Sequence, residues 1–141
     1  MDYLARESAD LSDGLWNRID ETVIGTARNQ LTCRRFLKVF GPLGAGVTTV
    51  AVDGVNKEEV LEDGIGRIVG RMQLELPVFY EDFTLLSRDM EHAAQTGYPL
   101  DLSVAIAAAK KASRREDDLI LNGSKALGTD GLLTVKGSSK I

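Results

Sequence analysis

The stretch PLDLSVAIAAAKKASRREDDLILNG, residues 99–123, carries the strongest helix signal of the chain. Asp101 or Ser103 can cap the start of this helix, and alanine dominates its middle. Gly123 stands where a C-terminal cap is expected, because glycine adopts the left-handed backbone without strain. We therefore predict a long helix over residues 101–121.

Upstream of this helix, DFTLLSRDMEHAAQTG predicts a second, short helix over residues 82–97 that ends at Gly97. The segment before it alternates apolar and polar residues, which is typical of a strand. Pro77 cannot donate to a strand ladder, so we expect an edge or a strand end there. The apolar face would carry Met72, Leu74, Leu76, Val78 and Tyr80.

A β-branched run at residues 47–55, VTTVAVDGV, predicts another strand. Residues 56–66, NKEEVLEDGIG, are acidic and polar, and we interpret them as an exposed loop tip. Residues 47–76 together then form a long two-stranded arm. Isolated hairpins are marginal in water, so such an arm is expected to lie against another surface.

The N-terminal part is predicted to contain an extended arm at residues 1–12 and a helix that follows Ser12 or Asp13. Gly25 lies inside this helix and lowers the stability of the helix by roughly 1 kcal/mol relative to alanine. The segment FLKVF, residues 36–40, alternates and is interpreted as a strand. The apolar positions of the helix recur at Leu15, Trp16, Ile19, Val23, Ile24, Ala27 and Leu31.

The glycine-rich segment 41–46 does not fit a nucleotide-binding loop. A phosphate-binding loop needs a lysine and then serine or threonine after its last glycine, but Gly46 is followed by Val47 and Thr48. The dinucleotide motif has glycines spaced G-x-G-x-x-G before a helix, whereas this segment has G-x-x-G-x-G and leads into a β-branched run. With Pro42, the segment is interpreted as a turn between strands.

The other residues with reactive or ionisable side chains do not form a recognisable catalytic site. His92 is the only histidine and is interpreted as a surface residue rather than a metal ligand. Cys33 lies beside two arginines, which could lower its pKa, but an isolated cysteine is more often structural. The blocks KKASRR (110–115) and EDD (116–118) are compatible with a solvated helix face or with ion pairs to neighbouring subunits.

The composition argues against several broad classes of protein. The net charge of −4 and the isoelectric point near 5.0 argue against a general nucleic-acid binder and against attraction to anionic membranes. A single cysteine gives no intrachain disulfide, no signal peptide is visible, and no apolar run reaches membrane-spanning length. We expect a cytoplasmic protein with elements that need partner chains, and thus an assembly protein.

Five segments in the same order and with similar spacing resemble the N-terminal half of encapsulin shell proteins, the bacterial nanocompartment proteins with the tailed-phage capsid fold. They are DYLARESADLSDGLWNRIDETV, CRRFLKVFGPLGAG, YEDFTLLSRDMEHA, PLDLSVAIAAAKKASRREDDLILNG and GTDGLLT. The stretch at residues 21–46 is most similar to the myxobacterial type, whose compartments hold ferritin-like, iron-oxidising cargo. The resemblance implies an α+β chain with the Hong Kong 97-type phage capsid-like fold.

The resemblance also implies a division of the chain. Residues 1–46 would hold the N-terminal arm, a helix on the luminal side and a first strand. Residues 47–76 would be the extended loop that packs over a neighbouring subunit, and 77–141 the peripheral domain with the spine helix 101–121. The axial domain of the family lies beyond Ile141, so we expect it to be missing from this chain or supplied by a second chain.

By the same resemblance, many copies would assemble into an icosahedral shell that encloses cargo enzymes, and the chain itself would not be an enzyme. The cargo's C-terminal targeting peptide would bind at Ala27, Leu31, Arg34 and Lys38. Some relatives carry an acidic residue at the Lys38 position, so the preferred peptide can differ. Some relatives bind flavin through a tryptophan that DFTLL lacks, so no cofactor is expected. A phage capsid protein and a small binding or regulatory domain remain alternatives.

Overall fold

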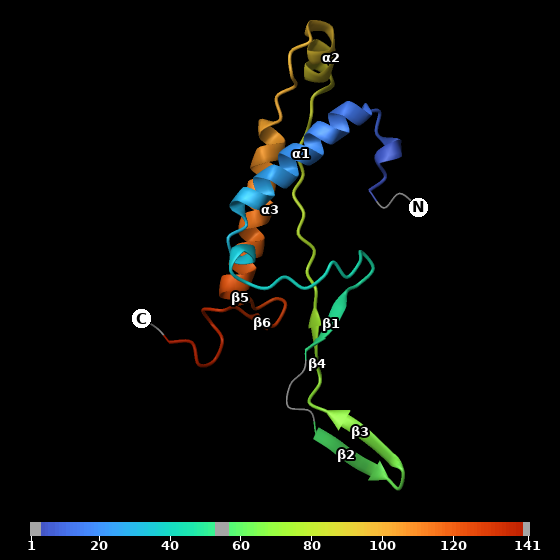
Figure 1. Cartoon of the computed structure of the whole chain (residues 1–141), viewed down its shortest axis with the longest axis vertical. Helices are drawn as coiled ribbons and strands as arrows, with labels where there is room; N and C mark the ends of the chain where they lie inside the picture. Colours follow the sequence, from blue (N-terminus) through green and yellow to red (C-terminus); the bar gives the residue numbers. More distant parts are fainter. Residues whose placement is uncertain (1–3, 53–56, 140–141) are drawn as a thin grey trace. The chain divides into compact units, whose positions relative to one another are not determined.

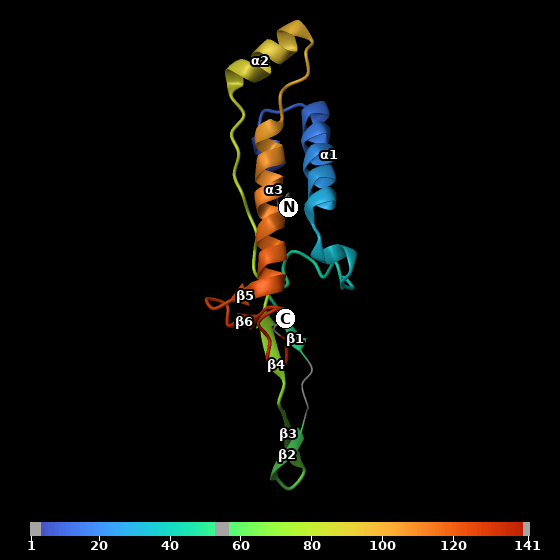
Figure 2. The same ribbon diagram turned by 90° about the vertical axis from the view of Figure 1, so that its left-hand side faces the viewer.

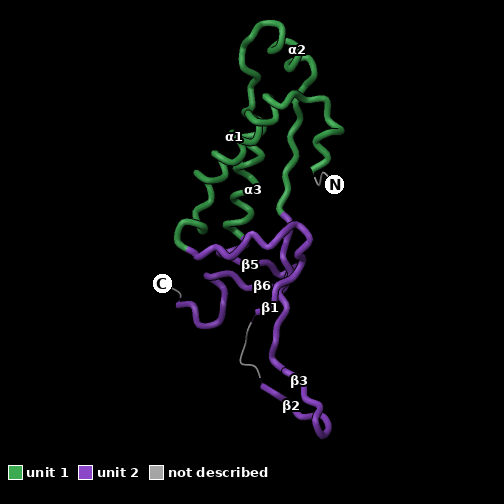
Figure 3. Tube along the Cα trace, turned by 45° about the vertical axis from the view of Figure 1, so that its right-hand side comes forward, with its two compact units in different colours: residues 1–36, 79–118 green, residues 37–78, 119–141 purple. Residues whose placement is uncertain are grey.

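The computed structural model describes residues 4–52 and 57–139 and has mixed α and β structure (Figure 1). The chain forms two compact units (Figure 3). The first comprises residues 1–36 and 79–118, and the second comprises residues 37–78 and 119–141. The predicted α+β class is confirmed.

Three helices organise the first unit: α1 (Asp13–Gln30), α2 (Ser87–Thr96) and most of α3 (Ser103–Asn122). Helices α1 and α3 lie side by side (Figures 1 and 2). The predicted cap of α1 is confirmed, because the Ser12 hydroxyl accepts a hydrogen bond from the Leu15 amide at 3.2 Å.

A small apolar core joins α1 to the start of α3. Its buried members are Ile19, Leu100, Leu102 and Ala105. Ala105 has no accessible surface, and its short side chain lets the neighbouring elements approach closely. The partly buried side chains around this core are Leu11, Leu15, Trp16, Val23, Phe83, Leu85, Met90 and Ala93.

The short segment before α1 is held by the helix it precedes. It contains a 3-10 turn, η1 (Arg6–Ser8). The Arg6 guanidinium donates to both carboxylate oxygens of Asp20, at 2.8 and 2.6 Å, and lies 4.7 Å from the centre of the Trp16 ring. The predicted arm at residues 1–12 is therefore folded back in part, while its first three residues lie outside the described residues.

The ends of α2 and α3 follow local signals. Helix α3 ends before Gly123 and α2 ends before Gly97, as predicted. Both glycines have a left-handed backbone, with φ angles of 71° at Gly123 and 73° at Gly97. The Asp101 carboxylate accepts a hydrogen bond from the Ser103 amide at 2.9 Å. The predicted start of α2 at residue 82 is wrong, because α2 begins at Ser87 and residues 82–86 are not helical; among them, Phe83 and Leu85 pack against the core.

The second unit contains a long antiparallel arm. Strand β1 (Thr49–Val52) pairs with β4 (Met72–Glu75), and β2 (Lys57–Glu62) pairs with β3 (Ile65–Val69). The two-stranded arm predicted over 47–76 is confirmed for the described residues; residues 53–56, part of the predicted strand and loop, lie outside them. The predicted loop at 56–66 is wrong, because Asp63 and Gly64 alone form the turn and both flanks are strands.

One further strand prediction fails for lack of a partner strand. Residues 36–40 are not a strand in the described chain, and four of their side chains are exposed hydrophobic groups. The strand end expected at Pro77 is confirmed, because β4 ends at Glu75, directly before Leu76 and Pro77. The glycine-rich segment has no strand before it, and its one backbone hydrogen bond runs from the Val47 amide to the Gly44 carbonyl.

The end of α3 lies in the second unit and packs on the residues that follow it. Two short strands, β5 (Gly123–Ser124) and β6 (Thr129–Asp130), pair directly after the helix. The amides of Leu132 and Leu133 then donate to the carbonyls of Ile120 and Leu121, each at 2.9 Å. These bonds satisfy carbonyl groups that a helix end leaves open.

Candidate functional site

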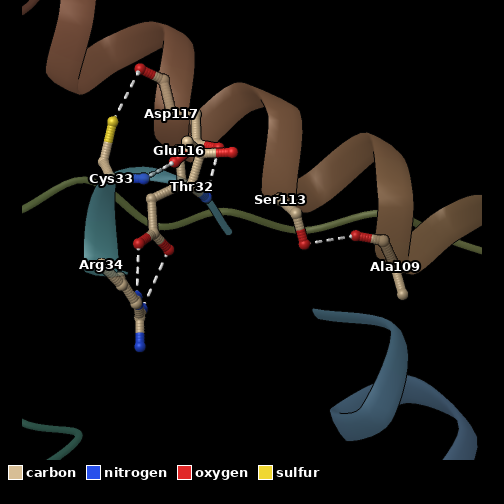
Figure 4. Close-up of polar contacts among 7 residues, drawn as sticks. All are labelled: Thr32, Cys33, Arg34, Ala109, Ser113, Glu116 and Asp117. Atoms are coloured by element: carbon tan, nitrogen blue, oxygen red, sulfur yellow. Dashed lines mark hydrogen bonds and ion pairs between the residues drawn. The ribbon is translucent and has the colours of Figure 1, made fainter. Parts of the chain in front are cut away.

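The turn that follows α1 is tied to α3 by a carboxylate. The 3-10 turn η2 (Cys33–Arg35) begins with amides that have no partner in the turn itself. The two carboxylate oxygens of Asp117 accept hydrogen bonds from the amides of Thr32 at 2.9 Å and Cys33 at 3.0 Å (Figure 4). Asp117 therefore caps a turn that lies far away in the sequence.

Glu116, next to Asp117 on α3, binds the same turn through Arg34. The Arg34 guanidinium donates to both carboxylate oxygens of Glu116, at 2.6 and 2.9 Å (Figure 4). The Arg34 side chain is 52% exposed and that of Glu116 is 19% exposed. The hydrogen bonds to Glu116 raise the pKa of Arg34. We call the contacts of Glu116 and Asp117 with Thr32, Cys33 and Arg34 the turn latch.

Charge, burial and hydrogen bonding in the turn latch also shift the pKa values of Asp117 and Cys33. Burial by itself would raise the pKa of the Asp117 carboxyl, but the hydrogen bonds from the Thr32 and Cys33 amides outweigh it, so this pKa is lowered. Burial raises the pKa of the Cys33 thiol, as do the hydrogen bond and the charge of Asp117. Cys33 has no accessible surface, which supports its structural role over a reactive one.

Three of the four residues predicted to bind a cargo peptide lie in the first unit, at the end of α1 and in the turn after it. Ala27 and Leu31 are partly buried near the end of α1, where the Leu31 amide donates to the Ala27 carbonyl at 2.9 Å. Arg34 follows them in the first unit, already paired with Glu116. Lys38 is exposed and belongs to the second unit.

The role of the charged block on α3 was only partly foreseen from sequence. Several of its groups form ion pairs within this chain: Glu116 with Arg34, and Arg115 and Lys111 with Glu81. Opposite charges at residues 34–35 and 116–118 were the available signal, but sequence gives no way to pair groups 82 residues apart. Within the described residues, Lys110 and Arg114 remain exposed.

Nothing in the described ranges resembles a metal centre, since no group of three or more histidine, cysteine or acidic side chains converges there. His92 is exposed on α2, as predicted. It borders a hollow of about 350 Å³ whose polar lining includes Asp89, Tyr98 and Asp101. None of the helices described is long and apolar enough to cross a bilayer.

Comparison with known proteins places the chain in a family. Residues 1–141 match the family described as "encapsulating protein for peroxidase". The chain is 38% identical to the type 1 encapsulin shell protein EncA of Myxococcus xanthus, over 96% of this chain and 50% of that protein. It is 36% identical to a diheme-cytochrome-encapsulin shell fusion protein of Kuenenia stuttgartiensis, over 86% of this chain and 36% of that protein.

A more distant relative is the type 1 encapsulin shell protein of Brevibacterium linens, with 27% identity over 99% of this chain and 51% of that protein. The chain spans about half the length of the curated type 1 relatives it matches. The family match covers every residue of the chain, and the resemblance inferred from its five ordered segments is confirmed. The chain belongs to the encapsulin shell-protein family.

Proposed function

We propose that the chain is a structural, self-assembling shell component of an encapsulin nanocompartment. The observation that carries the proposal is the exposed arm in the second unit. Every residue of β2 is exposed, and apolar side chains project from the arm without cover, including Val60 at 75%, Ile68 at 54% and Met72 at 69%. An arm without a core of its own is stabilised by burying such side chains against another chain.

Family membership supports a finer assignment within the Hong Kong 97-type capsid fold. In this proposal α1 is the luminal N-terminal helix, α3 is the spine helix of a peripheral domain at 77–141, and residues 47–76 form the extended loop over a neighbouring subunit. Residues 1–46 contain the N-terminal arm, helix α1 and the segment that leads into the extended loop. Many copies then form an icosahedral shell in the bacterial cytoplasm.

The shell is proposed to enclose cargo rather than to catalyse a reaction itself. Ala27, Leu31 and Arg34 lie close in sequence at the end of α1 and in the turn after it, and we assign them to the dock for a cargo's C-terminal targeting peptide. Lys38 is included as a neighbour in sequence. The resemblance of residues 21–46 to the myxobacterial type of shell is the ground on which we propose a ferritin-like, iron-oxidising cargo. Any activity then belongs to the enclosed protein.

The assembly role can be tested at the arm. We expect the substitutions Val60→Asp and Ile68→Asp to prevent particle formation, because a buried unpaired carboxylate is costly at a subunit contact. Circular dichroism should show the helices of the first unit unchanged. The matched control is Val78→Asp, which places the same charge at another exposed valine, outside the arm. Normal particles from both arm variants would contradict the proposal.

A further inference from the structure

The turn latch fixes the short segment on which most of the proposed cargo dock is built. Leu31 is held on one side by its own amide, which bonds to the last turn of α1, and on the other by the capped amides of Thr32 and Cys33. Asp117 is thus the only described side chain that bonds the backbone directly after Leu31. Charge-assisted bonds of this kind are about twice as strong as neutral ones.

Glu116 controls the charge that an approaching peptide meets at Arg34. Its two oxygens engage the Nε and one terminal nitrogen of the guanidinium, so the cation is neutralised by a bidentate partner. The Arg34 side chain nevertheless stays half exposed. A peptide that reaches this side chain meets an ion pair, and an acidic group on the peptide would have to compete with Glu116.

We propose that Asp117 and Glu116 are positioning and specificity residues of the cargo dock, an inference that rests on the function proposed above. Asp117 holds the turn so that Leu31 and Arg34 keep one geometry. Glu116 occupies Arg34 and thereby disfavours acidic side chains in the targeting peptide. Neither residue needs to contact the peptide for these effects.

The test uses particles of the whole chain and a fluorescent protein that carries the C-terminal peptide of the cargo found in wild-type particles. A second version of this reporter replaces one neutral residue of the peptide with glutamate. Loading is measured as reporter fluorescence per shell chain after production in the same cells. The reaction of Cys33 with a thiol reagent reports separately whether the turn has opened, because this thiol has no accessible surface in the intact latch.

Asp117→Ala is expected to expose Cys33 and to lower loading about tenfold, since the two released amides lose their acceptor. The control Asp82→Ala removes a carboxylate from an exposed residue of the same unit and should change neither readout. Asp117→Asn keeps one acceptor and should restore loading in part. Glu116→Gln is expected to narrow the difference in loading between the acidic and neutral reporters, without exposing Cys33.

Normal loading by Asp117→Ala particles with a reactive Cys33 would overturn the positioning role. Unchanged discrimination between the two reporters in Glu116→Gln would overturn the charge role. If neither Asp117 variant formed particles, the latch would act in folding rather than docking, and the inference would be wrong. A wild-type chain that forms no particles would instead overturn the shell function itself.

Discussion

Asp117 and Cys33 lie 84 residues apart in sequence, yet the carboxylate of one accepts a hydrogen bond from the amide of the other at 3.0 Å. The same carboxylate also binds the Thr32 amide, so one side chain on α3 caps the turn that ends the α1 segment. This contact connects the two halves of the first unit, which the arm separates in sequence.

The turn latch is predicted to open in acid. The pKa of Asp117 is lowered in the folded chain, so its contribution to stability is present above the ordinary value of 3.8 and is lost as the pH falls through the folded value. We expect Cys33 to stay protected from a pyridyl disulfide, a reagent that reacts with thiols in acid, at pH values above 3.8, and to become reactive only as the pH falls below that ordinary value. Asp117→Asn, which cannot titrate, should remove this pH dependence; an identical acid profile in that variant would assign the opening to another group.

The small core predicts a strong contrast between two isoleucines of α1. Ile19 is buried against α3, whereas Ile24 is 49% exposed. Ile19→Ala should lower the free energy of unfolding by about 2–5 kcal/mol through the lost burial and the cavity left behind. Ile24→Ala should change it by less than about 1 kcal/mol. Urea unfolding followed by circular dichroism measures both, and equal effects would mean that this core does not hold α1.

Two glycines predict opposite effects of the same substitution. A Cβ added at Gly25 or at Gly128 meets no atom within 4 Å, but Gly128 has a φ of +64° and Gly25 lies inside α1. Gly25→Ala should raise the free energy of unfolding by up to about 1 kcal/mol, because alanine favours helix. Gly128→Ala should lower it by about 1 kcal/mol through left-handed strain. Stabilisation by both substitutions would be inconsistent with this backbone geometry.

Gly123 is predicted not to tolerate a larger side chain, for steric reasons. A Cβ on Gly123 would collide with backbone atoms of residues 129–131, and its φ is also positive. Gly123→Ala should therefore cost more stability than Gly128→Ala, which carries the strain without the collision. Thermal unfolding of the two variants compares them directly; an equal loss would show that the β5–β6 pair relaxes freely around position 123.

The ion pair of Arg34 with Glu116 should contribute little to overall stability. Arg34 is half exposed, and pairs at the surface are typically worth less than about 1 kcal/mol. A double-mutant cycle with Arg34→Gln and Glu116→Gln, measured by urea unfolding, should give a coupling energy within that range. The coupling should also shrink with added salt. A larger, salt-independent coupling would indicate that the pair is buried in the assembled protein.

Sequence predicted best what is decided locally. Ser12, Gly97 and Gly123 marked helix ends correctly because capping depends on neighbouring residues. The acidic strand β2 was mistaken for a loop because its exposed side chains resemble those of a loop. The Asp63–Gly64 pair that directly follows β2 was the hairpin signal that could have corrected the interpretation.

Long-range pairing explains what sequence could not supply for the candidate site. The segment with Ala27, Leu31 and Arg34 was identified by resemblance, but its partners Glu116 and Asp117 lie on an element more than 80 residues away. Nothing local distinguishes a carboxylate that caps a distant turn from one that faces water. The strand predicted at 36–40 failed for a related reason, because a strand forms only where another strand pairs with it.

The most direct test of the shell function is native mass measurement combined with negative-stain microscopy of the purified 141-residue chain. The proposed function predicts closed particles that contain many copies of this chain. A stable monomer or dimer that forms no particles would contradict it.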